Sequence, residues 1–275
     1  MVHRYDTVEG LYDLSWSESN PNVLVTAAAD GGILLFDTKI PDQPISGRRE
    51  HQREASCVEW NIVSRDDTFL SSSYDGTVKI WSASRVAKGS TVTLNGHSGY
   101  VYQASWSPRE TSVLLSVGAD RSIGLWDIRS ASSPVQKIPN AHENEILSVD
   151  WNKWDSLQFA TGSVDATIRI WDWRMIGASS GGRDHPSHTL RGHQRAIRRV
   201  KWSPFSATNL VSVGYDMALR VWDLRSLNPM AGTWEGHTEF VTGVDICLHD
   251  RSMLLATAAW DRTVALLRPR DWGQW

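Results

Sequence analysis

One residue recurs along this chain at a nearly constant spacing. An aspartate stands six residues before the end of a short hydrophobic segment at Asp30, Asp75, Asp120, Asp165, Asp216 and Asp261. The successive gaps are 45, 45, 45, 51 and 45 residues. A period of this length, with Gly-His near the start of a unit and Trp-Asp near its end, is typical of propeller blades built from four antiparallel strands. The period therefore predicts an all-β fold with six repeats.

Three other residue types keep a constant distance from these aspartates. A hydroxyl residue lies four positions before each one, at Thr26, Ser71, Ser116, Thr161, Ser212 and Thr257. Six positions after it stand Phe36, Trp81, Trp126, Trp171, Trp222 and Leu267. In five units a histidine lies 23 or 24 positions before it, at His51, His97, His142, His193 and His237, and the first unit has Thr7 there. The unit therefore repeats in residue type as well as in length.

These columns resemble those of WD-repeat proteins, in which Asp orients His, His meets the hydroxyl, and the hydroxyl meets the indole N–H inside the blade. The resemblance implies that the four complete sets are structural: His51, Ser71, Asp75 and Trp81; His97, Ser116, Asp120 and Trp126; His142, Thr161, Asp165 and Trp171; His193, Ser212, Asp216 and Trp222. It also implies one WD-repeat β-propeller domain over residues 1–275, with repeats near 7–37, 51–82, 97–127, 142–172, 193–223 and 237–268.

The same residue types also suggest a catalytic triad, and this alternative is weaker. A Ser-His-Asp nucleophile needs one exposed set in a cleft, whereas here the set recurs at fixed register. No pair of His or Cys has zinc spacing, and no glycine-rich phosphate loop is present. We therefore expect no catalytic residues, no metal site and no cofactor.

The charge balance and the termini restrict the class of partner. Lys and Arg number 28 against 31 Asp and Glu, a net charge of -3, which argues against a nucleic-acid-binding protein. No apolar run approaches the roughly 20 residues of a membrane span, and Met1–Gly10 lacks the pattern of a signal peptide. Two widely separated cysteines fit a reducing compartment. These features predict a cytosolic protein without membrane insertion.

Alternation and turn residues place the strands within a unit. For the third repeat they predict Val92–Asn95 as the outer strand of the preceding blade, and then strands at Tyr102–Ser107, Val113–Val117 and Ser122–Asp127. Inward-facing tryptophans are expected on the first strand of five units, at Trp16, Trp60, Trp106, Trp151 and Trp202. Arg174–His188 is a Gly/Ser-rich insertion, expected to be a surface loop, and Met1–Tyr5 is a candidate outer strand for the last blade after Thr263–Arg268.

On WD propellers, function comes from surfaces, and three columns surround the centre of the top face. They lie three and five residues after the histidine and one before the aspartate. Here they are Gly10, Tyr12, Ala29; Glu54, Ser56, Tyr74; Tyr100, Tyr102, Ala119; Glu145, Leu147, Val164; Ala196, Arg198, Tyr215; and Phe240, Thr242, Trp260. Seven of these eighteen are aromatic, as in binding hot spots. With Glu54 and Glu145 beside them, they predict a ligand with a basic residue and an apolar side, for instance an amphipathic helix.

Several segments resemble one family closely. They are Leu11–Glu18 (LYDLSWSE), Ala141–Trp151 (AHENEILSVDW), Gly192–Phe205 (GHQRAIRRVKWSPF) and Gly236–Asp245 (GHTEFVTGVD). They are similar to blades of the peroxin-7 family, the cytosolic receptors for the type-2 peroxisomal targeting signal. The resemblance covers essentially the whole chain. It implies a ligand of the form Arg/Lys-Leu/Val/Ile, five residues, then His/Gln-Leu/Ala, at the N-terminus of peroxisomal matrix proteins.

For this chain, the resemblance implies a peptide-binding surface made by Tyr12, Glu54, Tyr74, Tyr100, Tyr102, Glu145, Leu147, Arg198, Tyr215, Phe240 and Trp260. It further implies a co-receptor of the peroxin-5 or peroxin-20 type, a peroxisomal docking complex, and cycling between the cytosol and the peroxisomal matrix. Members of the family have seven blades, with one more before the segment Leu11–Glu18, where this chain has ten residues. We therefore expect either a missing first blade or a ring adapted to six.

A second function class is a substrate receptor of a cullin-type ubiquitin ligase. Trp126–Arg129, Trp171–Arg174 and Trp222–Arg225 each read Trp-Asp-x-Arg, the pattern by which such receptors engage their adaptor. The simpler interpretation is that each arginine pairs with a nearby carboxylate. A histone-tail-binding propeller is a third possibility, with no specific residue to support it.

Overall fold

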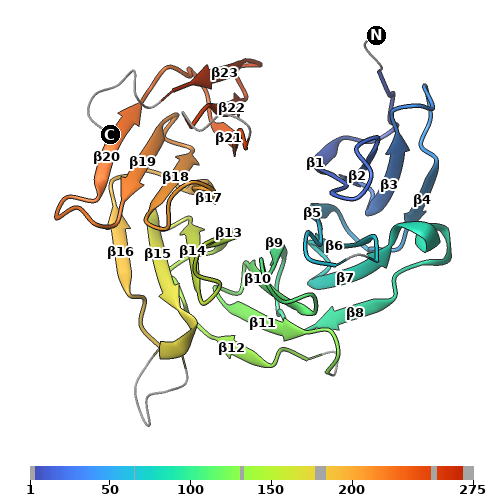
Figure 1. Ribbon diagram of the computed structural model, residues 1–275, viewed down its shortest axis with the longest axis horizontal. Coiled ribbons are helices and arrows are strands. Elements are labelled where there is room, and N and C mark those ends of the chain that lie inside the picture. Colours follow the sequence, from blue (N-terminus) through green and yellow to red (C-terminus); the bar gives the residue numbers. More distant parts are fainter. Residues whose placement is uncertain (1–3, 65, 131–132, 177–183, 249–252, 269–275) are drawn as a thin grey trace. The chain divides into compact units, whose positions relative to one another are not determined.

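The computed structural model describes residues 4–64, 66–130, 133–176, 184–248 and 253–268 (Figure 1). The chain divides into two compact units, residues 1–140 and 141–275, which are described separately here. Almost all regular structure is antiparallel sheet, and each sheet is a simple meander in which neighbours in sequence are neighbours in space. Short 3-10 helices follow two of the sheets' third strands, at η1 (Ala83–Lys88) and η2 (Trp173–Met175).

The first unit contains three four-stranded sheets. The first sheet is β1 (Leu11–Trp16), β2 (Val23–Ala28), β3 (Gly32–Asp37) and β4 (Ser46–Arg49). The second is β5 (Ala55–Trp60), β6 (Thr68–Ser73), β7 (Thr77–Ser82) and β8 (Val92–Asn95). The third is β9 (Val101–Trp106), β10 (Val113–Gly118), β11 (Ile123–Asp127) and β12 (Gln136–Ile138).

The second unit contains three further sheets. The fourth sheet is β13 (Ile146–Trp151), β14 (Gln158–Ser163), β15 (Thr167–Asp172) and β16 (His188–Arg191). The fifth is β17 (Ile197–Trp202), β18 (Asn209–Gly214), β19 (Leu219–Asp223) and β20 (Met230–Trp234). The sixth is β21 (Val241–Ile246), β22 (Leu255–Ala259) and β23 (Val264–Leu267).

These six sheets are the blades predicted from the period, so the WD-repeat β-propeller fold class with six repeats is confirmed. The predicted outer strand Val92–Asn95 coincides with β8. The other three strands, predicted for the third repeat, begin and end within one residue of β9, β10 and β11. The spacing succeeds because each blade repeats the same turn. The residue after the aspartate has positive φ in all six repeats, and it is a glycine in the first two, Gly31 and Gly76.

In the four complete sets, the histidine, hydroxyl, aspartate and tryptophan are joined by hydrogen bonds. His Nδ1 lies 2.9 Å from the Asp carboxylate and His Nε2 lies 2.7–2.8 Å from the hydroxyl oxygen. The indole Nε1 donates to the same hydroxyl oxygen over 2.7–2.9 Å. A neutral histidine that donates from Nδ1 accepts at Nε2, so the hydroxyl donates to His and accepts from Trp. Every polar atom of this buried chain therefore has a partner.

The first and last of the six repeats lack parts of this network. In the first, Thr7 and Phe36 replace histidine and tryptophan, and the buried Thr26 Oγ1 has no hydrogen-bond partner among the described residues. In the last, His237 contacts Asp261 and Thr257, but Leu267 replaces the tryptophan. A buried hydroxyl without a partner contributes desolvation cost and no hydrogen bond, so Thr26 is a weak point of the first sheet.

Within each unit, side chains of one inner strand bind the free backbone N–H groups of the next. Asp13 Oδ2 accepts from Val58 N at 3.3 Å, and Ser148 Oγ accepts from Val200 N at 3.0 Å. Asp150 Oδ2 likewise accepts from Trp202 N at 2.7 Å. Because an inner strand pairs on one side only, these bonds satisfy donors that would otherwise be buried alone.

Two of the inner-strand tryptophans also join neighbouring blades. Trp60 Nε1 donates to Ser15 O at 2.9 Å and Trp106 Nε1 to Glu59 O at 3.3 Å, both on the preceding inner strand. Trp60, Trp106, Trp151 and Trp202 are buried, whereas Trp16 is 48% exposed. The prediction that Trp16 faces inward is therefore wrong. Its strand, β1, is the first described strand of its unit, so no described strand of that unit precedes it and can cover the indole.

The suggested outer strand for the last blade is not formed by the described part of Met1–Tyr5. Arg4 and Tyr5 lie in no strand, and among the described residues the sixth sheet has three strands. Instead, the Tyr5 ring packs edge-on against Phe36 at 4.9 Å, and its hydroxyl donates to Asp37 O at 3.0 Å. The prediction is wrong for Arg4 and Tyr5 because Tyr5 gains these contacts on the first sheet. Residues 1–3 lie outside the described ranges.

The Gly/Ser-rich insertion is only partly described. Arg174 and Met175 belong to η2, and β16 begins at His188. Residues 177–183 and the C-terminal residues Trp272 and Trp275 lie outside the described ranges. Among the described residues, no helix is both long and apolar enough to cross a membrane.

Two threonines at the same position of the repeat provide a matched test of the network. Thr161→Val should destabilise the protein by about 1–3 kcal/mol, because His142 Nε2 and Trp171 Nε1 both lose their buried partner. Thr26→Val should be neutral or stabilising, because Thr26 Oγ1 has no partner among the described residues to lose. Urea unfolding followed by tryptophan fluorescence measures both. Equal destabilisation by the two changes would contradict a role for the hydrogen bonds.

The same network predicts how stability depends on pH. Burial lowers the pKa of His142 and of His193 and outweighs the hydrogen bonds that they donate to their aspartates, which act in the opposite direction. Burial alone would raise the pKa of Asp75, Asp165 and Asp216, but hydrogen bonds, first of all from His51, His142 and His193, hold each pKa well below the usual range.

The ordinary histidine pKa is about 6.5. As the pH falls below this value, His142 and His193 bind protons in the unfolded chain but stay neutral in the folded protein, so the free energy of unfolding should decrease. The aspartates contribute stability that is complete above their unfolded pKa of about 3.9 and is lost as the pH falls toward their folded values. Thermal melts should therefore show Tm falling in two stages on acidification. His142→Gln should reduce the slope of the first stage. A Tm that does not change from neutral pH down to about 5 would contradict the assignment.

Candidate functional site

One edge of every sheet carries the first and third of the predicted top-face columns. In all six repeats, the residue before the aspartate donates its backbone N–H to a backbone carbonyl over 2.8–3.0 Å. The carbonyl belongs to the residue three positions after the histidine position. The pairs are Ala29 with Gly10, Tyr74 with Glu54, Ala119 with Tyr100, Val164 with Glu145, Tyr215 with Ala196, and Trp260 with Phe240. The two columns are therefore adjacent by construction of the blade, whatever side chains they carry.

The second column lies at a β-bulge in each inner strand. The register with the next strand shifts across one residue in every sheet, and the skipped residues are Tyr12, Ser56, Tyr102, Leu147, Arg198 and Thr242. A bulge leaves one residue unpaired and turns its side chain away from the regular alternation. Six bulges at one position explain why this column can present side chains at the same edge as the other two.

In the first unit, four tyrosines from the three columns form one group, here called the tyrosine cluster. Tyr74 contacts Tyr12, Tyr100 and Tyr102 with ring centroids 6.0, 5.1 and 5.6 Å apart, and Tyr100 and Tyr102 are 6.4 Å apart. Tyr12 is 44% exposed and Tyr100 is 37% exposed. The cluster therefore joins three sheets and still offers aromatic surface to solvent.

In the second unit, Tyr215, Phe240 and Trp260 form the C-terminal aromatic cluster. Tyr215 stacks on Phe240 at 4.8 Å, and Phe240 and Trp260 are 5.3 Å apart. Trp260 is 62% exposed, far more than an indole that only fills a core. Exposed aromatic groups of this kind are typical of binding surfaces.

The charged members of the columns are partly exposed. Glu54 lies in the first unit, where its carbonyl accepts a hydrogen bond from the backbone N–H of Tyr74 in the tyrosine cluster. Glu145 and Arg198 lie in the second unit. Leu147, at 7% exposed, and Ser56, at 3%, are buried. Ser56 Oγ donates to Val101 O at 2.7 Å, which gives it a structural role. The structure thus presents most of the predicted surface residues to solvent and places Leu147 beneath them.

Sequence reasoning missed Arg53. Its guanidinium carbon lies 5.1 Å from the centroid of the Tyr100 ring, and its Nη1 donates to the Tyr100 hydroxyl at 3.1 Å. The residue stands two positions after His51 and so between the histidine and the first column. A basic residue directly before a column of aromatic and acidic residues was the available signal.

The arginines of the three Trp-Asp-x-Arg motifs fold back on their own motifs. Arg129 Nη2 lies 2.6 Å from Asp127, Arg174 Nη2 lies 2.5 Å from Asp172, and Arg225 Nη2 lies 3.1 Å from Asp223. All three guanidinium groups are largely exposed. Each arginine therefore has a local carboxylate partner, as the simpler interpretation expected.

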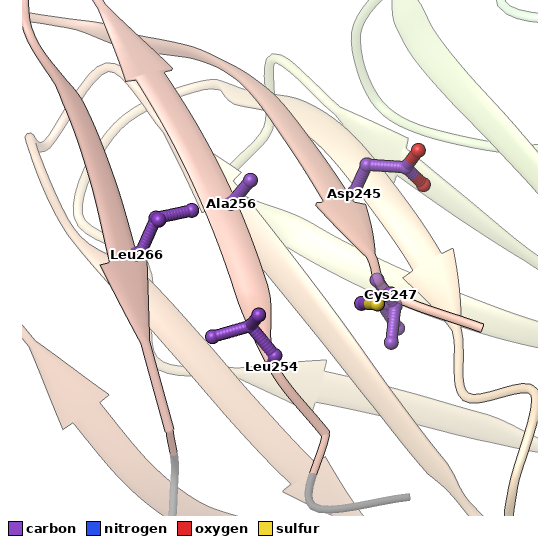
Figure 2. Close-up of a pocket in the computed structure, with 6 residues that line it drawn as sticks. Asp245, Cys247, Leu254, Ala256 and Leu266 are labelled. Atoms are coloured by element: carbon purple, nitrogen blue, oxygen red, sulfur yellow. The ribbon is translucent and has the colours of Figure 1, made fainter. Parts of the chain in front are cut away.

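A shallow pocket of about 200 Å³ lies on the sixth sheet and is lined by Asp245, Ile246, Cys247, Leu254, Ala256 and Leu266 (Figure 2). Figure 2 shows Asp245, Ala256 and Leu266 on three neighbouring strands, with Cys247 and Leu254 at strand ends and the Asp245 carboxylate at one side. Asp245 pairs with Lys201 at 3.4 Å. The pocket is mostly apolar and has no set of converging polar groups that could act on a substrate. Among the described residues, no group of three or more His, Cys, Asp or Glu is placed to hold a metal ion.

Comparison with known proteins agrees with this architecture. The WD domain, G-beta repeat family matches residues 43–82, 89–127, 132–172, 184–223 and 229–266. The chain is 48% identical over 265 residues to the peroxisomal targeting signal 2 receptor of Mus musculus, covering 96% of this chain and 80% of that protein. It is 49% identical over 244 residues to the receptor of the same name from Homo sapiens, covering 89% and 72%.

A plant relative extends the comparison. Peroxisome biogenesis protein 7 of Arabidopsis thaliana is 44% identical over 262 residues, covering 94% of this chain and 78% of that protein. Similarity at this level runs through all six sheets and not only through the repeat columns. This chain therefore belongs to the peroxisomal targeting signal 2 receptor family of WD-repeat proteins.

Proposed function

We propose that this chain is a receptor that binds the type-2 targeting signal of peroxisomal matrix proteins through the column residues of its sheets. The observation that carries the proposal is the 48% identity to a receptor named for this signal over 96% of the chain. The column residues fit such a ligand because aromatic rings receive apolar side chains and carboxylates attract a basic residue.

Each of the two units carries column residues of this kind by itself. In the first, Glu54 and the tyrosine cluster combine a carboxylate with rings that carry hydroxyl groups. In the second, Glu145 is combined with the more apolar C-terminal aromatic cluster and with Arg198. Each unit by itself thus offers a helical signal a carboxylate for its basic residue and aromatic rings for its leucines.

A catalytic function has no support in this architecture. The histidines of the repeated sets are almost fully buried, His51 at 2% and His142 at 1% exposed, and each is held by an aspartate and a hydroxyl. A nucleophile in such a position cannot reach a substrate. The relatives named above are called receptors or a biogenesis protein.

We further propose that tight binding requires a co-receptor of the peroxin-5 or peroxin-20 type. Glu54 is partly exposed, and ion pairs in contact with water are screened and contribute little. A second protein that covers the bound signal would exclude water and strengthen the same pairs. The complex would then deliver its cargo from the cytosol to a docking complex at the peroxisome, and the receptor would cycle between the cytosol and the peroxisomal matrix.

Charge reversal tests the ligand-binding role. Glu54→Arg or Glu145→Arg should weaken binding of a labelled signal peptide at least tenfold in the presence of co-receptor. A shielded charge-assisted hydrogen bond contributes about 1.5–3 kcal/mol, and about 1.4 kcal/mol corresponds to a factor of ten. Fluorescence anisotropy with and without co-receptor measures the effect. Glu110→Arg, at the turn between β9 and β10 on the other edge of the sheet, is the matched control and should bind like the parent. Normal binding by both reversals, with an intact fold, would contradict the surface assignment.

A second experiment separates this function from the ubiquitin-ligase alternative. Replacing Arg129, Arg174 and Arg225 together by Ala should leave signal binding and Tm nearly unchanged. Each guanidinium is exposed, and its ion pairs among the described residues are to its own motif or to a neighbouring aspartate. Anisotropy and thermal melts measure these quantities. Co-precipitation of a cullin adaptor by the parent and not by the triple variant would instead favour the alternative.

A further inference from the structure

Arg53 places a positive charge on the tyrosine cluster. Its guanidinium carbon lies 5.1 Å from the centroid of the Tyr100 ring, and Nη1 donates to the Tyr100 hydroxyl at 3.1 Å. The distances fit a cation–π contact combined with a hydrogen bond. The same Tyr100 ring stacks on Tyr74 at 5.1 Å, so Arg53 contacts a ring that packs against the central tyrosine of the cluster.

The backbone of Arg53 is anchored, whereas its side chain is exposed. Its carbonyl accepts a hydrogen bond from Ser73 Oγ at 3.3 Å, which fixes the residue between His51 and β5. From there the side chain extends from the second sheet to Tyr100, just before β9 of the third sheet. Within the described ranges, Arg53 forms no ion pair with a carboxylate. An exposed arginine held by an aromatic ring and one hydroxyl is easily displaced, since such contacts are weak.

We propose that Arg53 is a resident cation: in the free protein it occupies the position on Tyr100 that the basic side chain of a bound peptide takes. The inference rests on the proposed function of this surface and adds a residue that determines specificity for ligand charge. A basic peptide must displace Arg53 or accept repulsion from it, whereas a neutral peptide pays neither cost. Arg53 therefore lowers the affinity for basic ligands that do not compensate for its displacement elsewhere.

The repeat provides a matched control for this charge. Arg195 stands two residues after His193, as Arg53 stands two residues after His51, and it is also exposed. In the next repeat, Phe240 occupies the position that corresponds to Tyr100, yet no contact between Arg195 and an aromatic ring occurs in the described part of the chain. Arg195→Ala therefore removes the same charge at the same repeat position without removing a resident cation.

The test compares two synthetic peptides of the form Arg-Leu, five residues, His-Leu, one of them with norleucine in place of the arginine. Arg53→Ala should bind the arginine peptide about two- to fivefold tighter than the parent, the range expected for releasing an exposed cation–π contact, and should bind the norleucine peptide unchanged. Arg195→Ala should leave both affinities unchanged. Tyr100→Phe keeps the ring and loses the hydrogen bond, so it should give part of the gain. Equal effects of Arg53→Ala and Arg195→Ala, or weaker binding of the arginine peptide to Arg53→Ala, would overturn the inference.

A second measurement separates this inference from the proposed function. Methylguanidinium, a small probe of the guanidinium group, is titrated into protein with isotope-labelled tyrosine, and the Tyr100 ring resonance is assigned with Tyr100→Ala. The probe should shift this resonance in Arg53→Ala at concentrations that leave the parent unchanged. If the parent binds neither peptide but this difference is found, the proposed ligand is wrong and the resident cation stands. If the probe shifts Tyr100 equally in both proteins, or in neither, the resident cation is wrong.

Discussion

A buried hydroxyl that serves two partners is the contact on which each complete blade depends. Ser71 donates to His51 Nε2 and accepts from Trp81 Nε1, and its position on β6 brings strands and connecting segment together at one point. Asp75 then fixes the histidine and also accepts from the backbone N–H of Gln52. The turn that contains the aspartate is thereby held against the segment that leads into the inner strand. This is also the edge that carries the column residues, so the buried network positions the proposed binding surface.

The backbone of that edge has the same hydrogen bonding in every sheet, which favours the proposed recognition. Backbone hydrogen bonds of 2.8–3.0 Å between the first and third columns, and a bulge at the second, recur in all six sheets. Side chains on such a framework are preorganised, so less conformational freedom is lost when a ligand binds. Variation between blades is then confined to side-chain chemistry. The tyrosine cluster with Arg53 and the C-terminal aromatic cluster are two results of the same backbone carrying different residues.

Much of this could be predicted from the sequence, because the determining interactions are local to one repeat. The constant distances between His51, Ser71, Asp75 and Trp81 reflect one turn and one strand pairing, so they indicate both the blade and its network. Features that depend on neighbouring sheets or on residues distant in sequence were harder to predict. Trp16 has the same place in its repeat as Trp60, yet it is exposed, since burial depends on the sheet beside it. Tyr5 packs on Phe36, and this contact could not be predicted because Tyr5 lies outside the repeating columns. Arg53 was overlooked because its importance comes from Tyr100, 47 residues away.

The central claim is that the signal peptide binds at the column edge of the sheets. Site-specific photo-crosslinking tests it directly, with a photoreactive amino acid in place of Trp260 on the column edge or of the fully exposed Leu227 in the connection after β19. The account predicts that a labelled signal peptide, with co-receptor present, crosslinks to the protein from position 260 and not from position 227. Crosslinking from position 227 alone, in protein that melts like the parent, would show that the peptide binds elsewhere on the sheets.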